Sequence, residues 1–543
     1  MEKPTLIWGQ YEGREEWINA NVSYHTALFN EMTDASGNFT YPDYPMVLLD
    51  VPDPNYILAD FSGITLCFDP QYENWATSIE ITMHIKESGV STYHNYLFTG
   101  SGPYVWCPIT PSWDPEADTI VDFYVIVYSA HRPNSRLRFT SMRFGHSYEI
   151  PNDMLRSLDV AQSCDLSGIS APFSKMTATI DAAGLDAILG YRQRIELRTN
   201  IRFVGEYWVD SIAKAGKKTY TIIALDALGC LASQKFPGAN YSGAAVSTVL
   251  DDIVGNEYFL YDDVFSGTVT GLIPECDRRT ALNNLAISYG GAVLSKFYYL
   301  GLDEMAVVSP MNNPYGGFFP ISPEKTYINP ALVYEDQVTS YTITSHSFAQ
   351  NTNGDVAIGN TRYRDTRTEN TYTRSVPVGN ETKKTVSQAT LITAGTPLTR
   401  AQALLAGRYN RQMIWKGSFI WAEDAGDHSG RLGAWVRIYD GEGHEIRGAI
   451  QRADLVFSGA SIKVNAEILS FQLLQTPVLS YDEDDGYFTA SYPDGEECEI
   501  YKDGEYVATF QDEYYTNDPG DYYVVSVNSN NGYSYHSNTI TIK

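Results

Sequence analysis

The chain has 543 residues, of which 43% are hydrophobic and 19% are charged, and its formal net charge is −28. One hydrophobic core cannot hold a chain of this length, so we expect several domains. The negative charge argues against a sequence-specific nucleic-acid binder because it would repel a phosphate backbone. No stretch approaches the roughly 18 consecutive apolar residues of a membrane span, so none is expected.

The first residues of the sequence lack a basic segment followed by an apolar run, so we expect a protein that is not exported. The cysteines lack CxxC spacing, which indicates neither a zinc site nor a disulfide framework. We therefore predict reduced, mostly buried thiols without disulfide bonds. The six cysteines are Cys67, Cys107, Cys164, Cys230, Cys276 and Cys498.

Residues 1–148 are predicted to form a β-sandwich region rich in aromatic side chains. The segments Gly63–Leu66, Phe68-Asp69 and Arg138–Gly145 resemble parts of the galactose-binding-like jelly roll, also known from discoidin domains. Such a sandwich can hold a sugar against exposed aromatic rings, although Trp and Tyr also fill the cores of β-sandwiches. The candidate carbohydrate contacts are Trp75, Tyr104 and Trp113.

Residues 149–234 are predicted to form a first small β-barrel. A strand around Val160 and a second alternating strand lead into Arg194–Leu228, which reads as strand, long strand, strand. Thr199-Asn200 and Ala215–Lys217 supply the turns, because Asn and Gly tolerate positive backbone angles. Asp226-Ala227-Leu228 is expected to close the last strand.

Residues 235–329 are predicted to form an α+β domain. Ala244–Val254 and Asp277–Tyr289 show the apolar spacing of helices, and Asp277 is a plausible N-cap. Strands are expected at Ala292–Leu300 and Met305–Val308, followed by a connector rich in Pro and Gly.

Residues 330–475 are predicted to form a second barrel with a helix at Thr399–Trp415. Ala434–Leu469 repeats the plan of Arg194–Leu228, with strands at Trp435–Tyr439, Ile446–Phe457 and Ile462–Leu469. The two three-strand units share a pattern and almost no identity. Duplication is one explanation, and the frequency of three-strand meanders in β proteins is the other.

Residues 476–543 begin at a sharp shift to an acidic, Tyr-rich composition. Tyr501–Glu505 reads as a hairpin turn between short alternating strands, which indicates a module similar to fibronectin type III or immunoglobulin domains. The expected fold is therefore mainly β and multidomain: a β-sandwich, two small β-barrels with an α+β insert, and this C-terminal module.

Three features of residues 148–475 carry a further resemblance. They are a barrel that ends in Asp226-Ala227-Leu228 before a helix, the helix start Cys276–Leu282 that leads through Gly290-Gly291 to paired strands, and the helix Thr399–Trp415 before a barrel with the Gly441–Gly448 hairpin. In this order the parts resemble the tail hub proteins of tailed bacteriophages, including the structural N-terminal region of siphophage tail-tip proteins.

This resemblance implies a structural protein and not an enzyme. It implies a homotrimer with two related barrels per chain, arranged as a pseudo-sixfold ring between a sixfold tail tube and a threefold tip. The implied partners are a distal tail protein or tail tube, a tape measure protein, and tail-tip fibre or receptor-binding proteins, with DNA only as transiting cargo. The implied location is the virion tail tip, after synthesis in the bacterial host cytoplasm.

The sequence offers two polar clusters. Glu423, Asp424, Asp427 and His428 lie between glycines, so a polar loop is the simpler interpretation than a metal site. The stretch Asp482–Asp485 is similar to the start of a calcium loop, but the twelfth position is Pro493 where Glu is needed. Neither HExxH nor GxSxG occurs, and we expect no catalytic, cofactor-binding or metal-binding residues.

The alternative function is a carbohydrate-binding or carbohydrate-active multidomain β protein. Paired carboxylates for glycoside hydrolysis cannot be recognised by spacing, because the fold brings them together. Such a protein would usually be exported, and the start of the sequence shows no signal for export. The mass in solution would separate an oligomeric hub from this alternative.

Overall fold

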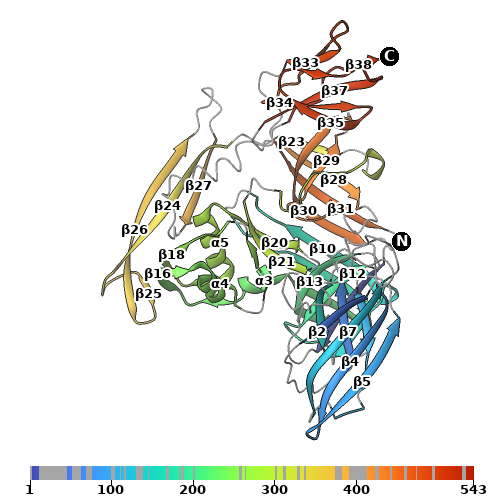
Figure 1. Cartoon of the computed structure of the whole chain (residues 1–543). Helices are drawn as coiled ribbons and strands as arrows, with labels where there is room; N and C mark the ends of the chain where they lie inside the picture. Colours follow the sequence, from blue (N-terminus) through green and yellow to red (C-terminus); the bar gives the residue numbers. More distant parts are fainter. Residues whose placement is uncertain are drawn as a thin grey trace.

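The structure is a computed structural model of the chain, shown in Figure 1. It describes residues 3–10, 46–51, 63–68, 76–99, 104–110, 112–114, 118–129, 139–144, 146–166, 170–182, 185, 189–199, 202–255, 258, 260–262, 264–299, 302–309, 313–326, 330–334, 338–373, 382–389, 413–421, 427–440, 443–457, 461–471, 474–491, 496–528 and 533–543. Strands far outnumber helices and form several separate sheets, which confirms the expected mainly β, multidomain fold.

The largest element of the fold is a 13-stranded sheet that contains both three-strand units. Among the described strands its main path is open at both ends, so the two expected barrels are parts of one continuous sheet. The path runs through β23 (Ala331–Tyr334), β28 (Met413–Ile420), β31 (Ile462–Ser470), β30 (Glu445–Phe457), β10 (Leu155–Ser163), β11 (Lys175–Asp181), β14 (Thr219–Leu225), β13 (Phe203–Lys214), β12 (Arg194–Thr199), β1 (Pro4–Gln10) and β9 (His146–Ile150), with β29 (Trp435–Tyr439) on β30 and β22 (Phe319–Pro320) on β29.

The first three-strand unit is β12, β13 and β14, as the alternating sequence predicts. Alternate side chains of a strand point to opposite faces, and β14 accordingly buries Tyr220, Ile222 and Ala224 completely. The second unit is β29, β30 and β31, again as predicted. Residues of both units belong to one hydrophobic core.

The expectation that Asp226-Ala227-Leu228 closes a strand is wrong. The helix α3 spans Ala227–Ala232, and Asp226 is its N-cap, because its Oδ1 accepts a hydrogen bond from the Gly229 amide at 2.7 Å. Aspartate is among the best N-cap residues, and this local bond outweighs the continuation of the strand pattern.

The α+β region lies between the two units in sequence and has its own core. Helix α5 spans Arg278–Tyr289, and the predicted cap is confirmed: Asp277 Oδ1 accepts a hydrogen bond from the Thr280 amide at 2.9 Å. Helix α4 spans Val246–Val254 and starts two residues later than expected, because Ala245 ends a strand. The strands are β15 (Lys235–Phe236), β16 (Ala239–Ala245), β17 (Leu260–Asp262), β18 (Thr268–Ile273), β19 (Cys276–Asp277), β20 (Ala292–Tyr299) and β21 (Leu302–Val308).

A four-stranded sheet is inserted between β23 and β28 and projects away from the main sheet in Figure 1. Residues 330–475 therefore contain a second sheet that the sequence did not separate from the barrel. Most of the expected helix Thr399–Trp415 lies outside the described residues, but from Met413 onward it is wrong, because β28 pairs with β31 and buries Trp415. The inserted strands are β24 (Val338–Gln350), β25 (Val356–Ile358), β26 (Thr361–Thr373) and β27 (Thr382–Ala389).

The N-terminal region contains two antiparallel sheets, and the expected strand near Arg138–Gly145 is observed as β8. In β4 the alternate residues Ile79, Ile81, Met83 and Ile85 are fully buried. The first sheet is β2 (Met46–Val51), β7 (Thr119–Ser129), β4 (Ala76–Glu87) and β5 (Val90–Thr99), and the second is β6 (Tyr104–Pro108), β3 (Gly63–Phe68) and β8 (Phe139–Phe144).

The C-terminal module also contains two sheets, and its predicted hairpin is confirmed by positive φ angles at Asp503 (52°) and Gly504 (88°). Its strands are β32 (Val478–Asp482), β33 (Tyr487–Ser491) and β36 (Tyr514–Tyr515) in one sheet, and β35 (Glu505–Phe510), β34 (Glu497–Lys502), β37 (Gly520–Val527) and β38 (Ile540–Ile542) in the other. In the described part of the chain, every helix is too short or too polar to cross a membrane.

Candidate functional site: the joint between the three-strand units

The two three-strand units match residue by residue in their backbone hydrogen bonds. Val209 exchanges two bonds with the loop before β12: its oxygen accepts from Arg192 at 2.8 Å and its amide donates to Gln193 at 2.9 Å. Ile450 does the same before β29, with Gly433 at 2.8 Å and Ala434 at 3.0 Å. Val209 is thus equivalent to Ile450, Arg192 to Gly433 and Gln193 to Ala434, and the two members of each pair are the same number of residues apart in the sequence.

The backbone conformation also matches at this place. Arg192 and Gly433 both have positive φ angles, 65° and 76°. The long strands β13 and β30 each carry a bulge one residue later, since the register shifts between Val209 and Ser211 and between Ile450 and Arg452. Independent meanders have no reason to share a bulge, a left-handed residue and two hydrogen bonds in one register, so these observations favour duplication.

The two units are connected by the antiparallel pairing of β10 with β30, which we call the internal joint. Its register places Val160 opposite Leu455 and Gln162 opposite Ala453. The first half of β30 pairs with β29 and the second half with β10, while β31 pairs with the opposite edge from Gly448 onward. The strands β29 and β10 therefore follow one another along the same edge of β30.

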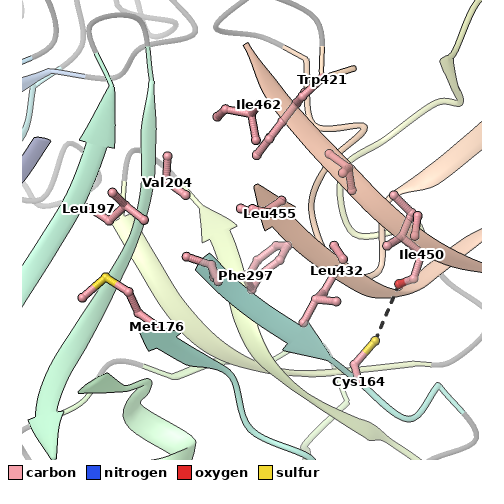
Figure 2. Close-up of a cluster of buried hydrophobic side chains, with 14 of the residues drawn as sticks. Cys164, Met176, Leu197, Val204, Phe297, Trp421, Leu432, Ile450, Leu455 and Ile462 are labelled. Carbon is pink, nitrogen blue, oxygen red and sulfur yellow. Dashed lines mark hydrogen bonds between the residues drawn. The ribbon is translucent and has the colours of Figure 1, made fainter. Parts of the chain in front are cut away.

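Apolar side chains from both units meet at the internal joint. Figure 2 shows Leu455 and Ile450 of the second unit facing the same core as Val204 and Leu197 of the first. The Cys164 thiol, just beyond β10, donates to the Ile450 carbonyl at 3.7 Å. Val160, Leu455 and Ala453 are at most 1% exposed, so the joint excludes water as a protein interior does.

A buried cationic group lies beside this core. Arg202, just before β13, is 1% exposed, and its guanidinium lies 4.3 Å from the ring centroid of Trp421. Arg431, in the loop before β29, lies 4.1 Å from the ring centroid of Tyr298 and donates to the Phe203 carbonyl at 2.7 Å. These cation–π and hydrogen-bonding contacts link the first unit and the α+β region to the segment that precedes the second unit.

The predicted polar cluster divides between described and undescribed residues: Glu423 and Asp424 lie outside the described part. The Asp427 carbonyl accepts from the Trp421 indole at 2.9 Å. His428 is buried, and its ring stacks on Tyr315 at 5.0 Å. Burial, with the nearby Arg431 and Arg202, lowers the pKa of His428 to about 3, so the imidazole is neutral at pH 7.

A second buried polar group connects the first unit to the α+β region. The Lys296 ammonium donates to the Glu206 carbonyl and lies 3.9 Å from the ring centroid of Tyr207. Burial raises the pKa of Asp226 to about 6, although Lys296 and the amides of Gly229 and Ser174 oppose the rise. Neither polar group holds an open pocket: the cavity bordered by Gln162, Lys296, Trp421 and Arg431 measures about 10 Å³, space for about one water molecule.

Of the three candidate carbohydrate contacts, the structure describes the side chain of Trp113. Trp113 is 8% exposed and packs against His94 and Tyr96, with ring centroids 5.1 and 6.4 Å away. Tyr104 begins β6, and Trp75 lies outside the described residues. Sugar binding by these residues stays a prediction.

No group of three or more His, Cys, Asp or Glu side chains in the described residues is arranged to hold a metal ion. Asp482 instead forms a tight turn, in which its Oδ1 accepts from the amides of Asp484 and Asp485 at 3.0 and 3.1 Å. The five cysteines whose side chains are described, Cys107, Cys164, Cys230, Cys276 and Cys498, are free thiols.

No family model matches the chain, and no curated protein matches it. Among solved structures it is similar to a tail protein from Neisseria meningitidis MC58, at 12% identity and a TM-score of 0.41, covering 59% of this chain and 93% of that one. It is also similar to the 43 kDa tail protein of prophage MuSo2 from Shewanella oneidensis, at 12% identity and a TM-score of 0.41, over 60% and 96% of the two chains. A third similar structure is the prophage tail protein gp18 from Listeria monocytogenes EGD-e, at 12% identity and a TM-score of 0.35, over 59% and 91%.

Proposed function

We propose that the chain is a structural protein of a bacteriophage tail or phage-like particle, and specifically its hub. In this proposal three copies form a ring of six three-strand units, which adapts a sixfold tail tube to a threefold tip and surrounds the path of the ejected DNA. The chain performs no catalysis in this role. Its partners are a distal tail protein or tail tube, a tape measure protein and tip proteins.

One observation carries the proposal: the two three-strand units repeat in register within one continuous sheet. A chain with two equivalent units can occupy two positions of a sixfold arrangement, so three chains fill it. The order of parts in the sequence, which resembles that of phage tail hubs, agrees with this arrangement. The buried, close-packed joint also fits a structural role better than a ligand site, which would need a cavity of hundreds of Å³.

The charge of the chain fits a channel for DNA. A net charge of −28 per chain makes a trimer strongly acidic, and an acidic wall opposes adhesion of a polyanion that must pass through. The proposed role needs transit of DNA and not retention.

The mass of the full chain in solution tests the proposal. Light scattering at increasing protein concentration should approach three times the 60.6 kDa of one chain. A chain that stays monomeric at every concentration, or that forms a stable dimer, would contradict the trimeric hub.

A further inference from the structure

In the part of the chain that the structure describes, two strand edges are open at the ends of the repeated region. The strand β23 ends the path of the main sheet, and β28 is its strand partner among the described residues. The strand β12 pairs with β13 as far as Trp208. Beyond Trp208, the same edge of β13 has no partner strand in the described part of the chain. Open edges of this kind template pairing with another strand.

Each open edge corresponds to one side of the internal joint. Leu332 of β23 lies opposite Trp415, whose other neighbour is Ile468. Val160 of β10 lies opposite Met176, whose other neighbour is Ala224. Ala224 pairs with Val209 and Ile468 pairs with Ile450, and these partners are the equivalent residues just before the two bulges. The strand β23 is therefore the equivalent of β10.

The second half of β13 is likewise the equivalent of the second half of β30. Counting from the shared bulge, Ile212 corresponds to Ala453 and Ala213 to Asp454. In the internal joint, Asp454 lies opposite Ala161, the residue after Val160. The same register between two copies would place Val333 opposite Ala213.

We propose that β23 of one chain pairs antiparallel with the second half of β13 of a neighbouring copy, and so repeats the internal joint between subunits. The occupant of both edges is a second copy of this chain. The proposal rests on the proposed function for the number of copies, while the pairing itself follows from the repeat. Because the two edges differ, the contact is head-to-tail and generates a ring when it closes.

The burial of side chains supports this pairing. At the internal joint Val160 is 1% exposed and Ala453 is fully buried. Their equivalents at the open edges, Leu332 and Ile212, are only half-buried although both pack against the main core. Val333 is 39% exposed. A neighbouring strand would cover these apolar side chains as β10 and β30 cover each other.

Cysteine cross-linking in the full chain tests the register. The double variant Val333→Cys with Ala213→Cys places two thiols directly opposite each other, at a Cα separation that a disulfide can span. The control Ala161→Cys with Asp454→Cys marks the internal joint and should form an intramolecular bridge, which also reports correct folding. The mismatched control Leu332→Cys with Ala213→Cys puts the thiols on opposite faces of the sheet.

After mild oxidation, the matched pair should give dimer and trimer bands on a non-reducing gel and nothing larger, and these bands should be lost in the mismatched pair. A trimer by light scattering in which the matched pair fails to cross-link would overturn the strand pairing and leave the proposed hub intact. Monomers by both methods would overturn both. A ladder that continues beyond the trimer would support the pairing and contradict the closed ring.

Discussion

Glu206 and Arg447 occupy the same position in the two three-strand units but carry opposite charges. Each is 4% exposed and lies opposite a residue of its own sign, Glu196 in the first unit and Arg437 in the second. Like charges directly across a strand pair destabilise a sheet. The chain compensates with Arg194, 3.4 Å from Glu206, and with Glu499, 2.7 Å from Arg447.

The position of Glu206 and Arg447 contacts a different part of the chain in each unit. The backbone carbonyl of Glu206 itself accepts a hydrogen bond from the Lys296 ammonium of the α+β region. Arg447 instead binds Glu499 and the hydroxyl of Tyr501, both in the C-terminal module, each at 2.7 Å. The same strand position therefore contacts a different neighbour in each unit: the α+β region through the Glu206 backbone, and the C-terminal module through the Arg447 side chain. The backbone plan is common to both units, and the side chains are adapted to the neighbour that each unit covers.

Aspartate substitutions at the equivalent positions Ala453 and Ile212 should give the largest difference in stability between the two units. Ala453→Asp puts a carboxylate into the internal joint, where the native side chain is fully buried, and should lower the free energy of unfolding by about 3–5 kcal/mol. Ile212→Asp, at the half-buried equivalent position, should cost the isolated chain about 1 kcal/mol or less but weaken assembly. Urea unfolding at low protein concentration and light scattering measure the two effects. Equal destabilisation by both variants would contradict the equivalence of an occupied and an open edge.

Arg447→Ala should loosen the C-terminal module from the second unit. The substitution leaves Glu499 and Tyr501 without their cation, and removing one partner of a buried pair costs about 3–5 kcal/mol. Burial and the nearby Glu499 act in opposite directions on Arg447, and the net effect raises its pKa, so the guanidinium stays charged. Limited proteolysis between the second unit and the C-terminal module should become faster. The control is Arg452→Ala, which removes an exposed pair with Asp454 worth about 1 kcal/mol at most; equal sensitivity of both variants would refute the anchoring role.

His428 should make stability depend on pH in one direction. Its pKa in the folded chain, about 3, lies below the ordinary value of 6.5, so only the unfolded chain takes up this proton as the pH falls below 6.5. Between pH 6.5 and 4 this should cost about 3 kcal/mol. Asp226, with its pKa raised to about 6, has the opposite effect over part of this range. Subtracting the free energy of unfolding of His428→Phe from that of the native chain cancels the contribution of Asp226. This difference should fall between pH 6.5 and pH 4, and a difference that does not change with pH would contradict the role of His428.

Gly433→Ala should have a smaller effect than the changes at Ala453, Arg447 and His428. Its φ of 76° is unfavourable for any residue with a Cβ, and the added methyl would lie 3.1 Å from Leu294 Cδ1. We expect a loss of about 1–2 kcal/mol in thermal or urea unfolding. The first unit accepts Arg192 at this position with a φ of 65°, so the chain should still fold. Complete unfolding of the variant would show that the two turns are less alike than their hydrogen bonds indicate.

The sequence predicted what depends on local patterns. Alternation identified both three-strand units, and the cap at Asp277 and the hairpin at Asp503-Gly504 follow from local chemistry. It could not predict the contact of Arg202 with Trp421, since these side chains come from distant segments and only the pairing of β10 with β30 brings the two units together. The shared bulge was equally hidden, because a bulge is defined by the partner strand. Trp415 was assigned to a helix because its pairing with β31 is not local.

Electron cryomicroscopy of the assembled full chain tests the central claim most directly. We expect threefold particles with six similar three-strand units around a central channel, in which the pairing of β10 with β30 within a chain alternates with the pairing of β23 with β13 between chains. Particles in which the two units of a chain lie at different radii, or in which copies meet through other strands, would contradict it.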